Sequence, residues 1–185
     1  MNHPAVLRNV RRTTQRGLTF IEMLATLTVL ALTVGTVAPS VSQMRDRRHL
    51  EGAAAQLATD VRYARSLALA HRAAVRLSVH SQGGNSCYVL HTGPAASCSC
   101  GGGDTATCGT GAQLLKVVGF DASGPVRFSS NSSSMLFDPD RGTVTPTGTM
   151  RLQLSNGPSL HQIVNIMGRV RACSPSGAMN GYPTC

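Results

Sequence analysis

The feature that most constrains the fold is an apolar block near the start of the chain. Residues 18–41 read LTFIEMLATLTVLALTVGTVAPSV and carry a single charged side chain, Glu22. A helix needs about 20 apolar residues to cross the hydrocarbon core of a bilayer, so the block predicts a membrane-spanning helix. A cleaved secretory signal, with an apolar core of about 7 to 15 residues, is shorter than this block.

Arginine lies on both sides of the block. The leader before it holds no acid and carries Arg8, Arg11, Arg12 and Arg16, and Arg45, Arg47 and Arg48 follow the block. The positive-inside rule therefore orients the helix only weakly. From charge alone, a plain membrane anchor stays an alternative.

The composition narrows the classes of function. A chain of 185 residues suits one small domain with an appendage and excludes a large multidomain enzyme. It carries 17 Lys+Arg against 8 Asp+Glu, a formal net charge of +9, and its only lysine is Lys116. Because the planar guanidinium fork of arginine suits phosphate groups, a polyanion is a candidate partner.

The stretch after the apolar block predicts a helix followed by a β-rich head. Apolar residues recur every three or four positions, which places them on one helix face: Leu50, Ala54, Leu57, Val61, Ala64 and Ala68. Short β-prone runs then alternate with turn residues, at 74–80, 87–92, 113–120, 125–129, 135–137, 149–155 and 160–172. We expect an α+β fold with the helix packed on a small head.

The same helix offers a second face with basic side chains, Arg65, Arg72 and Arg76, with Arg62 beside them. Such a row is a candidate phosphate-binding ridge, and its more frequent role is a solvated face.

The start of the apolar block carries a family resemblance. The sequence Arg16-Gly17-Leu18-Thr19-Phe20-Ile21-Glu22 resembles the class III leader of type IV pilins, with Leu18 in place of the usual Phe. The resemblance implies a type IV pilin-like fold, cleavage between Gly17 and Leu18 by a prepilin peptidase, and methylation of the new N-terminus. It also implies that Glu22 faces the N-terminal amine of a neighbouring subunit during assembly; the alternative is a Glu22 side chain that snorkels to the membrane interface.

A second resemblance covers the helix end. Asp60, the run Ala64-Arg65-Ser66, and Arg72 are similar to the region of the FimT/GspH family of minor pilins and pseudopilins that leads from the helix into the first strand. Residues 93–111, a Gly- and Cys-rich loop, match no pattern of this family.

Six cysteines are candidates for disulfides. A pilin leader implies an oxidising periplasm, where an even cysteine count in a small domain favours disulfides: Cys87, Cys98, Cys100, Cys108, Cys173 and Cys185. Cys98 and Cys100 are poorly placed to bond each other, and we expect Cys173 and Cys185 to close the tail. A zinc site formed by the first four is the alternative, without a CxxC pair or a suitable His to support it.

The last run, 160–172, is expected to form one strand. Alternation places Leu160, Val164, Ile166 and Val170 on one face and Arg169 and Arg171 on the other. Gly168 is expected to leave the backbone open to approach, and Tyr182 in the uncharged tail to be able to stack on a base or sugar. No acid follows Asp140, so the two arginines form a candidate phosphate grip.

The run Gly168-Arg169-Val170-Arg171 resembles the GRxR motif of FimT-like minor pilins. The resemblance implies capture of double-stranded DNA by a type IV pilus during natural transformation. The alternative is that Arg169 and Arg171 solubilise an edge strand or contact a neighbouring subunit.

No enzyme motif and no cofactor or metal-binding pattern is present, so a non-enzymatic subunit is expected. Its domains are a leader (1–17), a transmembrane half-helix (18–41), a periplasmic half-helix (42–73), a head (74–172) and a tail (173–185). The expected partners are other pilin subunits, prepilin peptidase and double-stranded DNA, and the expected location is the inner membrane in a single pass, then the surface pilus. Alternatives are a type II secretion pseudopilin, an assembly-priming minor pilin, and an adhesin or cargo-binding tip built on residues 93–111.

Overall fold

A computed structural model describes residues 17–185, apart from residues 102, 156 and 176. The chain divides into two compact units, Met1–Val41 and Ser42–Cys185, and helix α1 (Phe20–His71) contributes to both. The expected leader lies outside the described residues, except for Gly17. Among the described residues we find no helix that is long and apolar enough to cross a membrane. The membrane span predicted over residues 18–41 is not confirmed.

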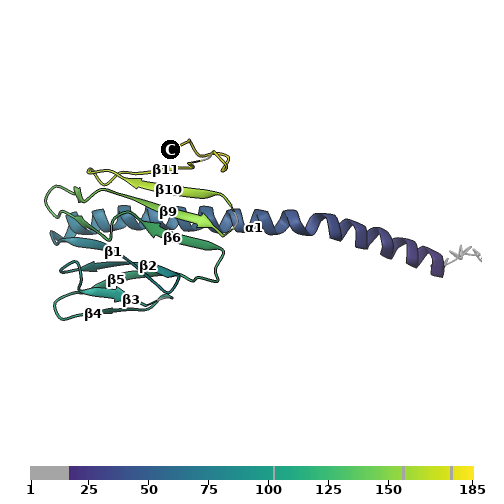
Figure 1. The fold of residues 1–185 in the computed structure, drawn as a ribbon, viewed down its shortest axis with the longest axis horizontal. Coiled ribbons are helices and arrows are strands. Elements are labelled where there is room, and N and C mark those ends of the chain that lie inside the picture. The colour runs from purple at the N-terminus through teal and green to yellow at the C-terminus, as the bar shows by residue number, and fades with distance from the viewer. Residues whose placement is uncertain (1–16, 102, 156, 176) are drawn as a thin grey trace, which may run out of the picture. The chain divides into compact units, whose positions relative to one another are not determined.

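The head is built from antiparallel strands in two main sheets (Figure 1). The first has the order β5-β2-β1-β7-β8, formed by β5 (Leu114–Phe120), β2 (Asn85–Thr92), β1 (Val75–Gln82), β7 (Ser134–Phe137) and β8 (Val144–Thr145). The second has the order β11-β10-β9-β6, formed by β11 (Val170–Cys173), β10 (Ser159–Val164), β9 (Gly148–Leu154) and β6 (Val126–Ser130). A separate hairpin pairs β3 (Cys98–Cys100) with β4 (Ala106–Cys108).

The part of α1 that belongs to the second unit packs on these strands. Its predicted apolar stripe is buried, each of the six side chains being at most 1% exposed. The stripe shares one core with residues from both sheets, among them Leu77, Tyr88 and Leu152. Removal of this apolar surface from water, at about 25 cal/mol per Å², holds the helix to the head. The predicted α+β architecture is confirmed.

Helix α1 ends at His71, two residues before the predicted end at 73. Arg72 adopts a left-handed conformation with φ of 49°, and the amide of Ala73 donates to the carbonyl of Ala68 at 3.3 Å. This bond closes the last turn as in a Schellman motif. Arg72 therefore ends the helix at a position that glycine usually occupies.

The Gly- and Cys-rich loop folds as a covalently fastened hairpin. Disulfides join Cys87 to Cys100 and Cys98 to Cys108, and with Val89 these cysteines form a second small buried cluster. The hairpin β3–β4 therefore covers the face of β2 that is turned away from the main core. All four thiols are paired in disulfides, so none of them is free to bind the zinc ion of the alternative.

Candidate nucleic-acid interface

The expected strand over residues 160–172 is two strands joined by a tight turn. β10 ends at Val164, β11 begins at Val170, and the two pair antiparallel, with Val164 opposite Val170 and Ile163 opposite Arg171. Ile166, expected on the buried face, lies in the turn and is 58% exposed. The prediction of one continuous strand was wrong. It gave more weight to the β propensity of this apolar run than to the turn signals at Asn165 and Gly168, and in the structure the turn forms.

Asn165 builds this turn. Its side-chain Oδ1 accepts hydrogen bonds from the amides of Met167 at 3.1 Å and Arg169 at 2.9 Å. Its own amide donates to the carbonyl of Arg169 at 3.1 Å, and its carbonyl accepts from the amide of Gly168 at 2.9 Å. An Asn side chain that bonds its own backbone a few residues on is a usual way to fix a turn, so the GRxR motif starts from a rigid support.

Gly168 is buried under Arg65 and does not leave the backbone open, contrary to the prediction. Its φ is +69°, and a Cβ added there would lie 2.7 Å from Cδ of Arg65 and 3.3 Å from Cγ2 of Val144. The Nε of Arg65 in turn donates to the carbonyl of Gly142 at 2.9 Å. Arg65 thus fastens the end of α1 to the turn at Gly142 and to the turn of the GRxR motif.

The basic ridge, the less favoured of the two roles considered for these arginines, is not formed. Arg65 is half-buried in this fastening role, and Arg76 lies on β1, where its Nη1 donates to Ser134 Oγ at 3.2 Å. Arg72 sits beyond the helix in its left-handed position. Arg62 remains an exposed helix side chain, so the four arginines form no continuous row.

Arg169 and Arg171 are both exposed, and Val170 between them is partly buried against the core. The ion pairs in the described part of the chain are Arg48 with Glu51 and Lys116 with Asp60. Neither guanidinium group of the GRxR motif is therefore neutralised by a carboxylate there. Two neighbouring guanidinium groups without a carboxylate partner, one at the end of the turn and one in β11, suit bidentate contacts with phosphate.

We expect Gly168→Ala to lower the free energy of unfolding by about 2 kcal/mol, because an L-residue with positive φ is strained and its Cβ would displace Arg65. The matched control is Gly83→Ala: Gly83 also has a positive φ of 59°, but nothing lies within 4 Å of its added Cβ. Thermal unfolding of the full chain in a non-ionic detergent measures both. Equal losses for the two variants would show that the contact with Arg65 does not matter.

A polar cluster of Asp60, Tyr88 and Lys116 lies next to the aromatic rings of the head. Asp60, 3% exposed, accepts from the hydroxyl of Tyr88 at 2.7 Å and from Nζ of Lys116 at 2.6 Å. Burial, and then the hydrogen bond to Asp60, raise the pKa of Tyr88 well above its usual range, so its hydroxyl stays a donor. The Tyr88 ring packs against those of Phe120 and Phe128, with centroids 6.3 and 5.6 Å away, and these two rings stack on each other at 5.0 Å. The polar contacts join α1 to β2 and β5 of the first sheet, and the contact of the Tyr88 ring with Phe128 extends to β6 of the second.

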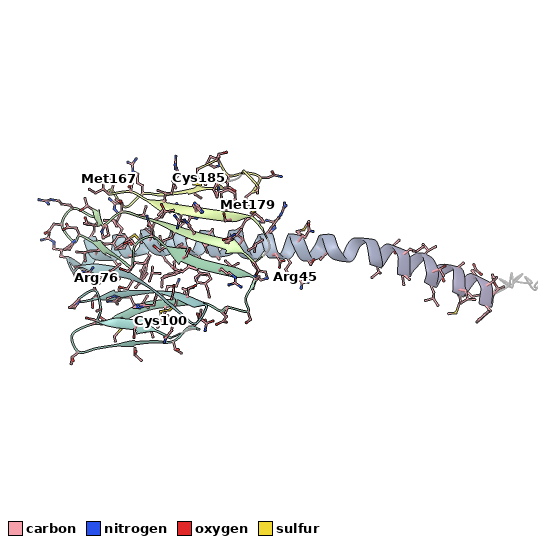
Figure 2. The ribbon with its side chains drawn as sticks, in the orientation of Figure 1. Arg45, Arg76, Cys100, Met167, Met179 and Cys185 are labelled. Carbon is pink, nitrogen blue, oxygen red and sulfur yellow. A yellow bond between two sulfur atoms is a disulfide. The ribbon has the colours of Figure 1, made fainter. Side chains whose placement is uncertain are left out.

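The tail is docked on the head. A third disulfide joins Cys173 to Cys185, the pair expected from the sequence, and Met179 between them is 2% exposed (Figure 2). Tyr182 packs against the main core, and its pKa is raised by burial and then by the charge of Glu51. Tyr182 is only partly buried, and the expectation that its ring can stack on a base stays a prediction.

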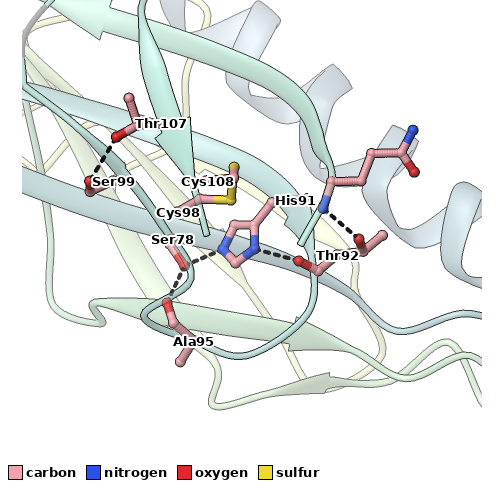
Figure 3. The surroundings of a disulfide bond; sticks show 9 residues. Ser78, His91, Thr92, Ala95, Cys98, Ser99, Thr107 and Cys108 are labelled. Atoms are coloured by element: carbon pink, nitrogen blue, oxygen red, sulfur yellow. Dashed lines mark hydrogen bonds between the residues drawn. A yellow bond between two sulfur atoms is a disulfide. The ribbon is translucent and has the colours of Figure 1, made fainter. Parts of the chain in front are cut away.

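Figure 3 shows a second group of buried, hydrogen-bonded polar side chains, beside the disulfide of Cys98 and Cys108. His91 Nε2 lies 2.9 Å from Ser78 Oγ, and Nδ1 lies 2.9 Å from the carbonyl of Thr92. Ser78 and His91 are 1% and 0% exposed. A serine next to an imidazole is a candidate nucleophile pair, but burial keeps a substrate from this one, and its contacts instead tie β1 to β2.

The other predicted site residues lie near the start of α1. Gly17 precedes the helix, Leu18 is 71% exposed, and Glu22 is in the first turn. The amide of Glu22 donates to the carbonyl of Thr19 at 3.1 Å. Cleavage, methylation and the assembly role of Glu22 stay predictions.

A helix packed on an antiparallel β-rich head is the fold of the type IV pilins, and solved structures of that class resemble this one. A crystal structure of the type IV minor pilin FimU from Pseudomonas aeruginosa (strain PAO1) aligns with a TM-score of 0.51 at 16% identity, over 74% of this chain and 97% of that one. A second crystal form of the same pilin aligns with a TM-score of 0.47 at 16% identity, over 71% of this chain and 98% of that one.

The family follows from the sequence itself. The model of the family described as "Type II transport protein GspH" matches residues 53–168, and the chain belongs to this GspH family. No curated protein matches it. Family and fold together define a subunit of the minor pilin and pseudopilin class, and the family implies association with other pilin subunits. The resemblance to the FimT/GspH family is confirmed.

Proposed function

We propose that this chain is a minor pilin of a type IV pilus that binds double-stranded DNA through Arg169 and Arg171 for uptake in natural transformation. One observation carries the proposal: both arginine side chains are exposed and unpaired with any carboxylate of the described residues, where the turn fixed by Asn165 and Arg65 leads into β11. Two exposed guanidinium groups this close together suit phosphate, and neither side chain packs in the core.

Binding of this kind is electrostatic. Each arginine that neutralises a phosphate releases condensed counterions, so affinity falls steeply with salt. Contacts with phosphate oxygens position a protein on the duplex without reading bases. The expected binding is therefore strong at low salt and nearly independent of DNA sequence, as uptake of unrelated DNA requires.

The path to the pilus is part of the proposal. Prepilin peptidase would cut between Gly17 and Leu18, the amine of Leu18 would be methylated, and Glu22 would meet the amine of a neighbouring subunit. The precursor would cross the inner membrane once through residues 18–41, with the head in the periplasm. No catalytic step is required of this chain.

The second candidate is a pseudopilin of the type II secretion system, with no role for nucleic acid. The description of the matched family as a type II transport protein favours it. An assembly-priming minor pilin is compatible with the same fold. In both cases Arg169 and Arg171 would contact another subunit, and their loss would change filament assembly and leave DNA affinity unchanged.

We expect the variant Arg169→Ala/Arg171→Ala to bind duplex DNA about 30-fold more weakly at about 0.15 M salt, and the log-affinity against log-salt slope to flatten by about two units. The full chain in a non-ionic detergent is titrated with a labelled duplex over a range of salt concentrations. The control Arg45→Ala/Arg62→Ala removes the same charge from exposed helix positions and should change the affinity less than about threefold. A wild-type chain without salt-dependent binding would contradict the proposal and favour the pseudopilin.

A further inference from the structure

The GRxR motif lies at one end of a larger basic surface. In an antiparallel sheet, paired residues point to the same face, and in the second sheet the register aligns three rows on its solvent face. The rows are Arg171, Ile163 and Thr149; then His161, Arg151 and Ser129, a row that ends at the edge strand in the buried Cys173; then Ser159, Gln153 and Arg127. Arg127, Arg151 and Arg171 are exposed on this face.

The opposite face of the same strands is apolar. Val126, Phe128, Met150, Leu152 and Leu160 point into the main core. The strong alternation fixes which side chains reach solvent, because a shift by one residue would bury the arginines. Arg127, Arg151 and Arg171 are thus held on one face by the whole sheet.

This face carries positive charge without compensation. Strands β6, β9, β10 and β11 contain no Asp or Glu, and neither Arg127 nor Arg151 takes part in an ion pair within the described residues. Burial, and then the charge of Arg151, lower the pKa of His161, so its imidazole is neutral at neutral pH. The arginines therefore supply the charge.

The three arginines form a diagonal stripe. From Arg171 to Arg127 the register crosses three strand spacings and four residues along the strands, which places their backbones about 20 Å apart, with Arg151 between them. Double-stranded DNA carries one phosphate charge per about 1.7 Å of axis. A duplex segment of this length carries about twelve phosphate charges on its two strands together.

The side chains on this face also select the form of nucleic acid. Proteins that bind single strands stack the bases on exposed aromatic rings. The four strands contain a single aromatic residue, Phe128, which is 4% exposed and points into the core. Arginines on a sheet face without an exposed Phe, Tyr or Trp suit the phosphate backbone of a duplex.

Resting on the proposed DNA-binding function, we infer that Arg127 and Arg151 are further binding residues, and that the solvent face of β6, β9, β10 and β11 is a duplex DNA footprint running diagonally from the GRxR motif. Arg169 and Arg171 hold one end of the duplex segment, Arg127 holds the other, and Arg151 contacts it between them.

The test compares three double variants of the full chain in a non-ionic detergent: Arg127→Ala/Arg151→Ala, Arg169→Ala/Arg171→Ala, and the control Arg45→Ala/Arg62→Ala. Affinity for a short synthetic duplex and for one of its separated strands is measured against salt. We expect Arg127→Ala/Arg151→Ala to lose about 30-fold in duplex affinity at about 0.15 M salt and about two units of slope. Its melting temperature should match that of the wild type, because both side chains are exposed.

The outcomes separate this inference from the proposed function. If Arg169→Ala/Arg171→Ala weakens binding and Arg127→Ala/Arg151→Ala behaves as the control does, the footprint is overturned and the proposed function stands. If the wild type shows no salt-dependent binding, the proposed function fails and the footprint with it. Wild-type binding to the single strand as tight as to the duplex would overturn the choice of duplex DNA.

Discussion

Replacing Asp60 by alanine is expected to lower the free energy of unfolding by about 3 kcal/mol. The carboxylate is the buried partner of both the Tyr88 hydroxyl and the Lys116 ammonium group. Without it, the fully buried Tyr88 hydroxyl keeps no acceptor and Lys116 loses its counter-charge. The orphaned hydroxyl costs about 1 to 3 kcal/mol. The Lys116 side chain is 35% exposed, so the loss of its counter-charge costs less than the figure of about 3 to 5 kcal/mol that is typical of a fully buried pair.

The measurement is chemical or thermal unfolding of the full chain in a non-ionic detergent. Asp46→Ala makes the same chemical change at an exposed position of the same helix and should cost less than about 0.5 kcal/mol. The double variant Asp60→Ala/Tyr88→Phe should lose less than the sum of the single variants, because the orphaned hydroxyl is then absent. A loss for Asp60→Ala as small as that for Asp46→Ala would show that the cluster does not stabilise the head.

The variant Cys173→Ala/Cys185→Ala is expected to lose about 3 kcal/mol of stability. The disulfide closes a loop of sequence separation 12, and a loop of this length restricts the unfolded chain by about that amount on the chain-entropy model. The tail is also expected to detach locally, because Met179 and Tyr182 are then held only by their contacts with the core.

Hydrogen exchange measured peptide by peptide resolves this effect. The tail amides should exchange faster in Cys173→Ala/Cys185→Ala and keep wild-type rates in Cys98→Ala/Cys108→Ala, which opens a loop of similar length, sequence separation 10, in the β3–β4 hairpin. Both variants should lose comparable stability. Wild-type exchange of the tail without its disulfide would mean that packing alone holds it.

Periodicity predicted the helix and the core well, because local spacing decides which face of an element is apolar. All six residues of the helix stripe are buried, and each of the seven expected β-prone runs overlaps at least one strand. The leader and Glu22 carry the first family resemblance within one short run of residues. These signals are local in the chain, so neighbouring residues are enough to show them.

The C-terminal motif shows the limit of such reasoning. Its four residues and their basic character are visible in the sequence, and so is the exposure expected of Arg169 and Arg171. The burial of Gly168 cannot be seen in the sequence, because it depends on Arg65, about one hundred residues earlier in the chain. Asn165 and Gly168 are nevertheless turn signals that a reading of the sequence can use.

The sequence by itself determined the α+β pilin-like class, the buried helix face, the β-rich head and the excess of arginine, since these depend on composition and local period. Only the tertiary structure decided how distant residues combine: Asp60 with Tyr88 and Lys116, Arg65 with Gly168, the pairing of Cys87 with Cys100 and Cys98 with Cys108, and the arginines of three strands on one face. Register, handedness of turns and packing set these distances. These distances depend on how distant segments of the chain pack together, so a short stretch of sequence does not predict them.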